Sequence, residues 1–201
     1  MTVPLLRETA DPAAEIIEEL RQARGRPDAA LRRAVPYAAA LAPAVMDLVE
    51  KAADGVYLTP NQYNLLFWGM HIAAASRRTE LYRPLLHLVR SLDDEGLHEL
   101  FGDGLTDTLK HVTISVFDGD TDALLTTIAD RSVADFARWG LLSAFTRLTF
   151  DGAIPRDVAL QFLDRFEREA LAGFGDVAWE GWAAAVVYLG FAELHLSLIH
   201  I

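Results

Sequence analysis

The densest group of chemically active side chains in this sequence lies in residues 93–107. Glu95 and His98 stand three residues apart, and Asp103 follows shortly after them. A glutamate and a histidine at this spacing share one helix face, as they do in carboxylate-bridged di-iron bundles. Such bundles also need a second motif of this kind and two further glutamates on facing helices, and only one motif is present here. The sequence therefore predicts no metal site, with Glu95, His98 and Asp103 as the only weak candidates for one.

Other patterns that carry chemistry are incomplete. Asp118, Asp120 and Asp122 alternate like the first ligands of a calcium loop, but Ala123 and Ala129 occupy the positions that need glycine and an acid. We interpret these aspartates as a helix stop followed by an N-cap. No zinc-protease histidine pair, Gly-x-Ser-x-Gly turn or glycine-rich phosphate loop occurs, and there is no cysteine. The sequence predicts no catalytic residue and no cofactor.

The charge balance argues against a nucleic-acid partner. The chain has 201 residues and a net charge of -11, so its field repels phosphate backbones. Its best basic candidates are interleaved with glutamate and aspartate, which is typical of a solvated face. These candidates are Arg21, Arg24, Arg26, Arg32 and Arg33.

The hydrophobic residues predict a packed core rather than a membrane span. They make up 52% of the chain, enough to build a core at this length. The uncharged stretch between Glu180 and Glu193 is shorter than the ~18 residues that a spanning helix needs, so we expect a central core helix there. We see no signal peptide. The absence of cysteine suits a reducing compartment, and we expect a cytoplasmic protein.

Helix signals extend from end to end of the chain. Asp11-Pro12 and Thr59-Pro60 each place a capping side chain before a proline suited to the first helical position. We expect Pro43 to open another helix. Residues 155–171 are the clearest amphipathic segment, and no strand-like alternation bounded by hairpin turns appears. The connections are short, so the sequence predicts an all-α fold of antiparallel pairs with about 10–11 helices.

A weak internal repeat supports this architecture. Trp68-Gly69 matches Trp139-Gly140 at an offset of 71 residues. Such an offset accommodates two helix pairs of a HEAT-like α-solenoid, in which stacking buries a continuous core. Trp68 and Trp139 would then occupy the same layer, either as packing residues or as the lining of a partner groove. We expect a single helical-repeat domain over residues 1–195.

Several segments resemble a bacterial domain-of-unknown-function family, number 1186 in that series, over roughly residues 28–195. They are Tyr82-Arg83-Pro84-Leu85-Leu86, Gly102-Asp103 with Leu105-Thr106-Asp107, Asp118-Gly119-Asp120 and the turn at residues 152–157. The resemblance implies a HEAT-type helical repeat and brings no activity with it.

The sequence departs from this family in two places. The cysteine-rich zinc knuckle of some relatives is missing. Residues 196–201 are similar to a translated sequencing-adapter tail, so we expect a non-native end and an array cut short near His195.

We therefore expect a protein-interaction scaffold that binds a protein or peptide. The residues that would serve interaction or packing are Trp68, Trp139, Asp103 and Asp107. The alternative is an enzyme with a dispersed Asp/Glu/His metal site around residues 93–107, in which His98 acts as ligand or base. The sequence leaves the oligomeric state open.

Overall fold

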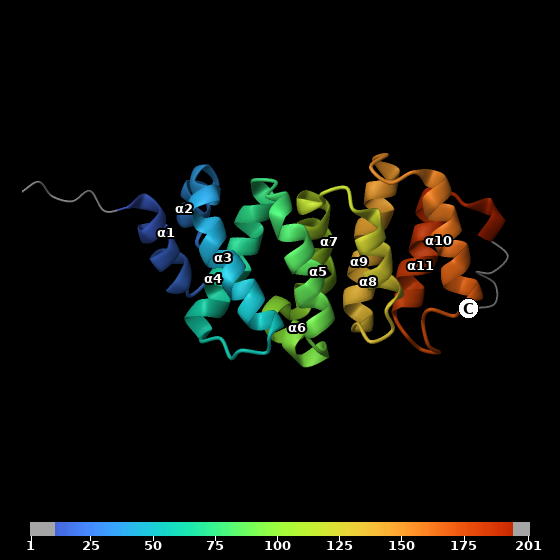
Figure 1. The fold of residues 1–201 in the computed structure, drawn as a ribbon, viewed down its shortest axis with the longest axis horizontal. Coiled ribbons are helices and arrows are strands. Elements are labelled where there is room, and N and C mark those ends of the chain that lie inside the picture. Colours follow the sequence, from blue (N-terminus) through green and yellow to red (C-terminus); the bar gives the residue numbers. More distant parts are fainter. Residues whose placement is uncertain (1–10, 195–201) are drawn as a thin grey trace, which may run out of the picture.

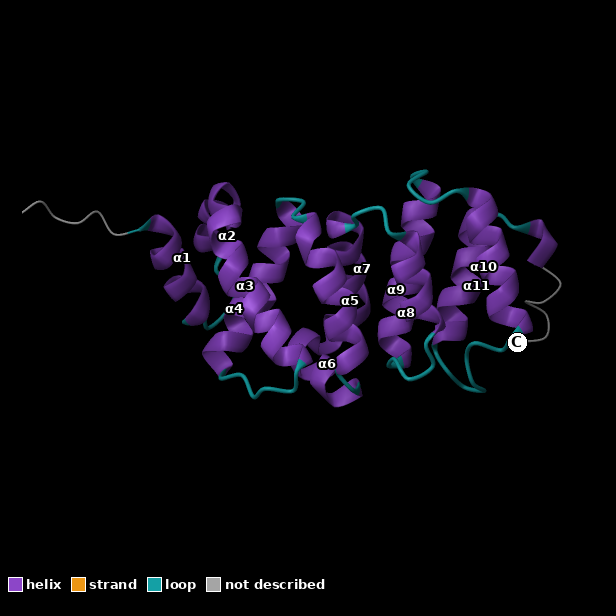
Figure 2. Cartoon of the chain, in the orientation of Figure 1, coloured by secondary structure: helices purple, strands orange, loops and turns teal. Residues whose placement is uncertain are grey.

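The computed structural model describes residues 11–194, and the expected non-native tail at 196–201 lies outside this range. Within it the chain forms α-helices and short 3-10 turns with no strand, which confirms the all-α fold (Figure 2). No helix of the described part is both long and apolar enough to cross a bilayer. The helices are α1 (Pro12–Arg21), α2 (Asp28–Ala34), α3 (Ala38–Ala53), α4 (Pro60–Ala75), α5 (Tyr82–Ser91), α6 (Asp94–Phe101), α7 (Leu105–Val116), α8 (Thr121–Ala129), α9 (Asp135–Phe150), α10 (Arg156–Arg168) and α11 (Ala178–Leu189).

Local capping fixes two of the predicted helix starts. The Asp11 carboxylate accepts the Ala13 amide at 3.0 Å, so α1 begins at the predicted cap. Thr59 and Gln62 form a reciprocal capping box at the start of α4, in which the Thr59 amide donates to the Gln62 side chain at 2.8 Å. These bonds satisfy amide groups that have no partner inside the helix.

The prediction that Pro43 opens a helix is wrong. Helix α3 begins at Ala38, and Pro43 lies within it. The 3-10 turn Val35–Tyr37 leads directly into this helix, and Ala38 and Leu41 are both buried in the core. Burial of these side chains upstream holds the first turn in place, although proline removes one backbone hydrogen bond.

The helices form two layers that follow the chain along its long axis (Figure 1). In one layer α1 packs against α4, α4 against α7, α7 against α9 and α9 against α11. In the other, α3 packs against α5 and α5 against α8. Sequential helices such as α3 and α4, or α8 and α9, run in opposite directions, as the short connections predict (Figure 1). A single hydrophobic cluster extends between the layers from Ala13 to Leu194.

The Trp-Gly repeat falls in one layer, on α4 and α9, but its glycines meet different partners. A Cβ on Gly69 would lie 2.4 Å from a methyl carbon of Val45, on α3 of the opposite layer. A Cβ on Gly140 would lie 3.0 Å from the Thr106 carbonyl oxygen, on α7 of the same layer. Both glycines permit close helix approach, so the two copies are related in position and not in detailed packing.

The expectation of a central helix near residues 180–193 is only partly correct. Trp182 is completely buried in α11, and its indole N–H donates to the Leu163 carbonyl on α10 at 2.8 Å. Val187 and Tyr188 on the same helix are 59% and 77% exposed, respectively. Helix α11 is the last α-helix of the described part; it packs against α9, and its Trp182 side chain reaches α10.

Two segments that carry the family resemblance contact each other. The hydroxyl of buried Tyr82 donates to the Asp120 carbonyl oxygen at 3.0 Å, and the Arg83 side chain lies 2.5 Å from the Asp120 carboxylate. Asp120 also accepts the Ala123 amide at 3.1 Å and so caps α8. This arrangement confirms the helix stop and N-cap expected at Asp118-Gly119-Asp120.

Arg138 is the one arginine that the structure buries within the described range, at 1% exposure. Its guanidinium donates to the Ile128 carbonyl at 2.8 Å, to the Asp176 carboxylate at 2.9 Å and to the Leu171 carbonyl. These acceptors come from the end of α8 and from the segment between α10 and α11. Burial lowers the pKa of Arg138, and the Asp176 carboxylate opposes that shift. One side chain thus ties the end of α8 and the segment between α10 and α11 to α9.

Candidate functional site

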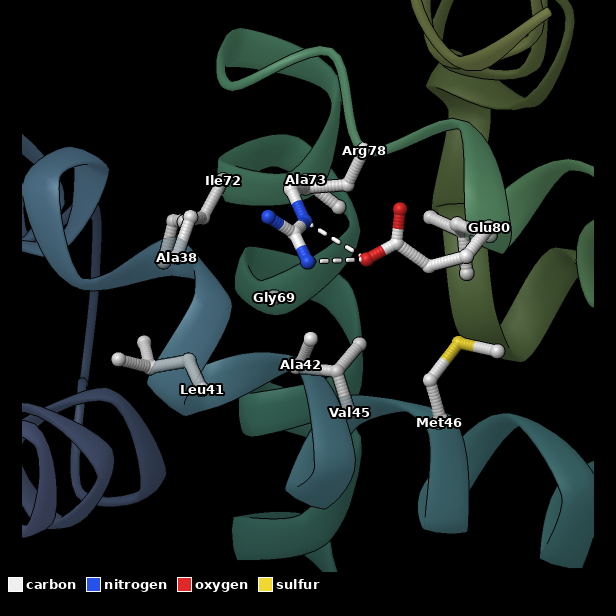
Figure 3. A pocket seen from close by; sticks show the side chains of 11 residues that line it. Ala38, Leu41, Ala42, Val45, Met46, Gly69, Ile72, Ala73, Arg78 and Glu80 are labelled. Carbon is white, nitrogen blue, oxygen red and sulfur yellow. Dashed lines mark hydrogen bonds and ion pairs between the residues drawn. The ribbon is translucent and has the colours of Figure 1, made fainter. Parts of the chain in front are cut away.

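The enclosed space between α3 and α4 is too small to be a ligand site. Figure 3 shows Val45 and Leu41 of α3 below Gly69 of α4, with the Arg78–Glu80 ion pair beside them. The space there measures about 10 Å³, room for one water at most. We therefore interpret it as a packing gap, and the candidate sites lie in the open hollows elsewhere on the surface.

A wide surface hollow lies where α6, the start of α7 and the start of α9 meet. We call it the acidic hollow, and its volume is about 640 Å³. Its lining combines carboxylates, a histidine and two aromatic rings. The lining residues are Asp94, Glu95, His98, Gly102, Asp103, Leu105, Thr106, Asp135, Phe136 and Trp139.

The turn from α6 to α7 positions the rim of this hollow. Asp93 caps α6 by accepting the Gly96 amide at 2.9 Å, which leaves Asp94 and Glu95 in the exposed first turn. Gly102 ends α6 with φ of +59°, a conformation that L side chains rarely adopt. The resulting short turn places Asp103 in solvent at the rim.

Helix α9 supplies the aromatic floor. Phe136 and Trp139 lie three residues apart on this helix, and their ring centroids are 6.2 Å apart. Phe136 is 47% exposed, whereas Trp139 is partly buried and lies over Gly181 of α11. Asp135 is fixed at the helix start, where its carboxylate accepts the Val177 amide at 3.3 Å. The floor is therefore held by the junction of α9 and α11.

The acidic hollow lacks the geometry of a metal centre. His98 Nε2 lies 4.0 Å from Asp103 Oδ1, and these side chains are 67% and 104% exposed. Within residues 11–194, no three His, Asp or Glu side chains gather closely enough to hold a metal ion. The geometry therefore offers no support for the enzyme alternative around residues 93–107.

The structure brings four of the predicted residues into this hollow and leaves two outside it. Glu95, His98, Asp103 and Trp139 all line it. Asp107 points elsewhere, because its carboxylate binds the Lys110 ammonium at 2.7 Å, a contact that lowers the pKa of Asp107. Trp68 lines a different hollow.

Sequence reasoning missed the other rim and floor residues of the acidic hollow, above all Asp135 and Phe136. The signal that would have found them is helical spacing. Asp135 and Phe136 precede Trp139 by four and three residues, so all three share one helix face.

Trp68 lines a hollow between α2 and α4 that carries arginines rather than a row of carboxylates. Arg26 and Arg32 lie at its edge, and Arg26 pairs with Asp28 at 2.8 Å. Arg32 makes no ion pair with another described residue. We call this surface the arginine hollow, and it has a volume of about 520 Å³. Two tryptophans of one helix layer thus sit in hollows of opposite charge.

His71 packs beside Trp68 in the arginine hollow. Its ring centroid lies 4.8 Å from that of Phe67 and 6.0 Å from that of Trp68. Partial burial lowers the pKa of His71 from its ordinary value of 6.5, and nearby His111 lowers it further. The folded protein therefore holds fewer protons at this site than the unfolded chain does at mildly acidic pH.

This shift predicts that His71 destabilises the fold as the pH falls below its ordinary pKa. Between about pH 7.5 and about pH 5.5 the free energy of unfolding should fall more steeply for the wild type than for His71→Gln. Urea unfolding followed by circular dichroism at the two pH values measures the difference. Equal slopes for the two proteins would contradict the prediction.

The fold and the two hollows define a class of protein: an all-α domain of antiparallel helix pairs with an open, tryptophan-lined surface. The chain belongs to the family described as protein of unknown function (DUF1186), whose family model matches residues 12–198. This match confirms the family resemblance seen in the sequence. Neither the curated proteins nor the solved structures contain a match to the chain.

Proposed function

We propose that this protein is an interaction scaffold that binds a protein or peptide at its two tryptophan hollows. The observation that carries the proposal is the placement of Trp68 and Trp139. Both are only partly buried and line open hollows on one helix layer, whereas Trp182 is completely buried. Tryptophan is enriched among the residues that dominate binding energy at protein interfaces.

The architecture that we propose is a HEAT-like α-solenoid, the helical array that we expect over residues 1–195. Its support is the succession α4, α7, α9 and α11 in one layer, backed by α3, α5 and α8 in the other. Stacked helix pairs present extended surfaces that suit peptide and protein ligands. Trp68 and Trp139 would then act as anchors at two points of one such surface.

The charge of the chain favours a protein partner over nucleic acid, and its lack of cysteine favours the cytoplasm. A net charge of -11 disfavours nucleic acid, and three of the five clustered arginines pair with acids of the same region. The absence of cysteine fits a reducing compartment.

Quantitative affinity capture tests the proposal. The immobilised chain and a Trp68→Leu/Trp139→Leu variant are challenged with lysate of the source cells, and bound proteins are measured by mass spectrometry. We expect a partner whose recovery drops about 30-fold with the variant, as loss of an interface anchor implies.

The matched control replaces exposed aromatics outside the hollows. Phe150 and Phe174 are 72% and 110% exposed, so Phe150→Leu/Phe174→Leu removes as many aromatic side chains without altering either hollow. This control should retain the partner, and thermal melts of all three proteins confirm folding. Recovery of no partner, or equal loss with both variants, would refute the scaffold function.

A further inference from the structure

We infer that the acidic hollow recognises a basic segment of the partner protein and seats an arginine side chain over its aromatic floor. This inference rests on the proposed scaffold function and names the chemistry of one of its two hollows. The charge of the rim, the exposure of the floor and the open shape of the hollow all suit such a ligand.

The rim carries negative charge that no lysine or arginine of residues 11–194 neutralises. Asp94, Glu95, Asp103 and Asp135 form no ion pair with a lysine or arginine of the described part. Many carboxylates elsewhere do, including Asp107 with Lys110 and Asp176 with Arg138. Like charges gathered around a low-dielectric surface raise the local potential, and an incoming cation relieves it. The rim therefore complements a basic ligand.

The floor of the hollow provides the second half of the recognition. The faces of Phe136 and Trp139 attract cations through their quadrupoles, most strongly for tryptophan. The same chemistry operates inside this protein, where the Arg156 guanidinium lies 4.6 Å from the centre of the Phe191 ring. An arginine suits such a site better than a lysine because its planar guanidinium stacks on a ring and binds carboxylates in pairs.

The shape of the hollow favours a side chain presented by a passing segment over an enclosed small molecule. The hollow is an open surface depression bounded by three helices, and His98 and Asp103 at its rim are largely in solvent. A peptide can cross such a surface while one arginine reaches the floor. Contacts to the rim charges would then be sensitive to salt.

Fluorescence anisotropy with a labelled octapeptide of alternating arginine and glycine tests this inference on the full chain. The site variant is Glu95→Gln/Asp103→Asn. The control variant is Glu50→Gln/Glu167→Gln, which also removes two negative charges, but outside the hollow. Glu95 and Asp103 are exposed, so their replacement leaves the fold intact. We expect the dissociation constant to rise about tenfold for the site variant and less than about twofold for the control.

Two further probes define what would overturn the inference. An octapeptide of alternating glutamate and glycine should not bind, and spermidine should compete only weakly. Equal weakening by the site and control variants would mean that the net charge of the chain alone attracts the peptide. Spermidine binding more tightly than the peptide would assign the hollow to a free polyamine.

The outcome is separable from that of the scaffold test. In one outcome, the Trp68→Leu/Trp139→Leu variant loses a partner while the Glu95→Gln/Asp103→Asn variant binds the peptide as well as the wild type does. That result would retain the scaffold function and reject the basic ligand. Peptide binding that depends on Glu95 and Asp103, with no captured partner, would support the cation-binding role of the acidic hollow and reject the scaffold function.

Discussion

Replacement of Arg138 by alanine is expected to lower the free energy of unfolding by about 4 kcal/mol, because it breaks a buried ion pair from one side only. The guanidinium of Arg138 is 1% exposed and serves three acceptors, of which the Asp176 carboxylate is the charged one. Its loss leaves Asp176 largely buried without its cation and leaves the Ile128 and Leu171 carbonyls without this donor. Urea unfolding followed by circular dichroism measures the change.

The control for this prediction lies on the same helix. Arg147 forms an ion pair with Asp151 at 2.7 Å, but its side chain is 61% exposed. Arg147→Ala should therefore leave the unfolding midpoint almost unchanged, because solvent screens an exposed pair. Arg138→Lys should be intermediate, since one ammonium group cannot reproduce the planar fork that reaches all three acceptors. A loss below about 1 kcal/mol for Arg138→Ala would show that water replaces the bonds without cost.

Replacement of Gly69 by alanine should destabilise the protein by about 2 kcal/mol, although alanine is the better helix former. In an unconstrained helix interior this change adds about 1 kcal/mol of stability. Here the new Cβ would lie 2.4 Å from a methyl carbon of Val45, a buried β-branched residue on α3. Valine has one strongly preferred rotamer in a helix, so the helices must separate to relieve the overlap.

The Val45→Ala background provides the control for this overlap. Removing the two Val45 methyl groups creates the space that Gly69→Ala requires, so the same change should become neutral or stabilising there. A double-mutant cycle from chemical denaturation gives this coupling directly. Stabilisation by Gly69→Ala in the wild-type background would disprove close packing of α3 and α4 at this point.

Much of the helical architecture was predictable because its signals are local. Thr59-Pro60 marks the start of α4 through a capping box that involves only neighbouring residues. Spacing alone predicts the buried stripe of α10, and four of its five expected members are buried: Ala159, Phe162, Leu163 and Phe166. The fifth, Ala170, lies beyond the end of the helix at Arg168 and is exposed. Pro43 failed as a helix start because tertiary burial of residues before it outweighs the local preference of proline.

The candidate site was predictable in pieces and not as a whole. The density of charged residues in the sequence marks Glu95, His98 and Asp103, and the Trp-Gly repeat marks Trp139. Their meeting in one hollow depends on how α6, α7 and α9 pack, and periodicity within one helix carries no information on that packing. The position of Asp135 at the rim also depends on the packing of these helices.

Arg138 shows the same limit at a structural position. In the repeat alignment it corresponds to Phe67, and nothing in the neighbouring sequence marks it as buried. Its acceptors lie 10, 33 and 38 residues away, so only the folded chain brings them to the guanidinium.

The sequence by itself determined that this protein is all-helical, acidic and a member of its family, because caps, helical periodicity and charge are properties of short segments or of the whole composition. Only the tertiary structure decided which side chains share a surface. It separated Trp68 from Trp139 into hollows of opposite charge, gathered Glu95, Asp103 and Trp139, and buried Arg138. These outcomes arise from close packing between helices, and small shifts of one helix against another change which faces meet.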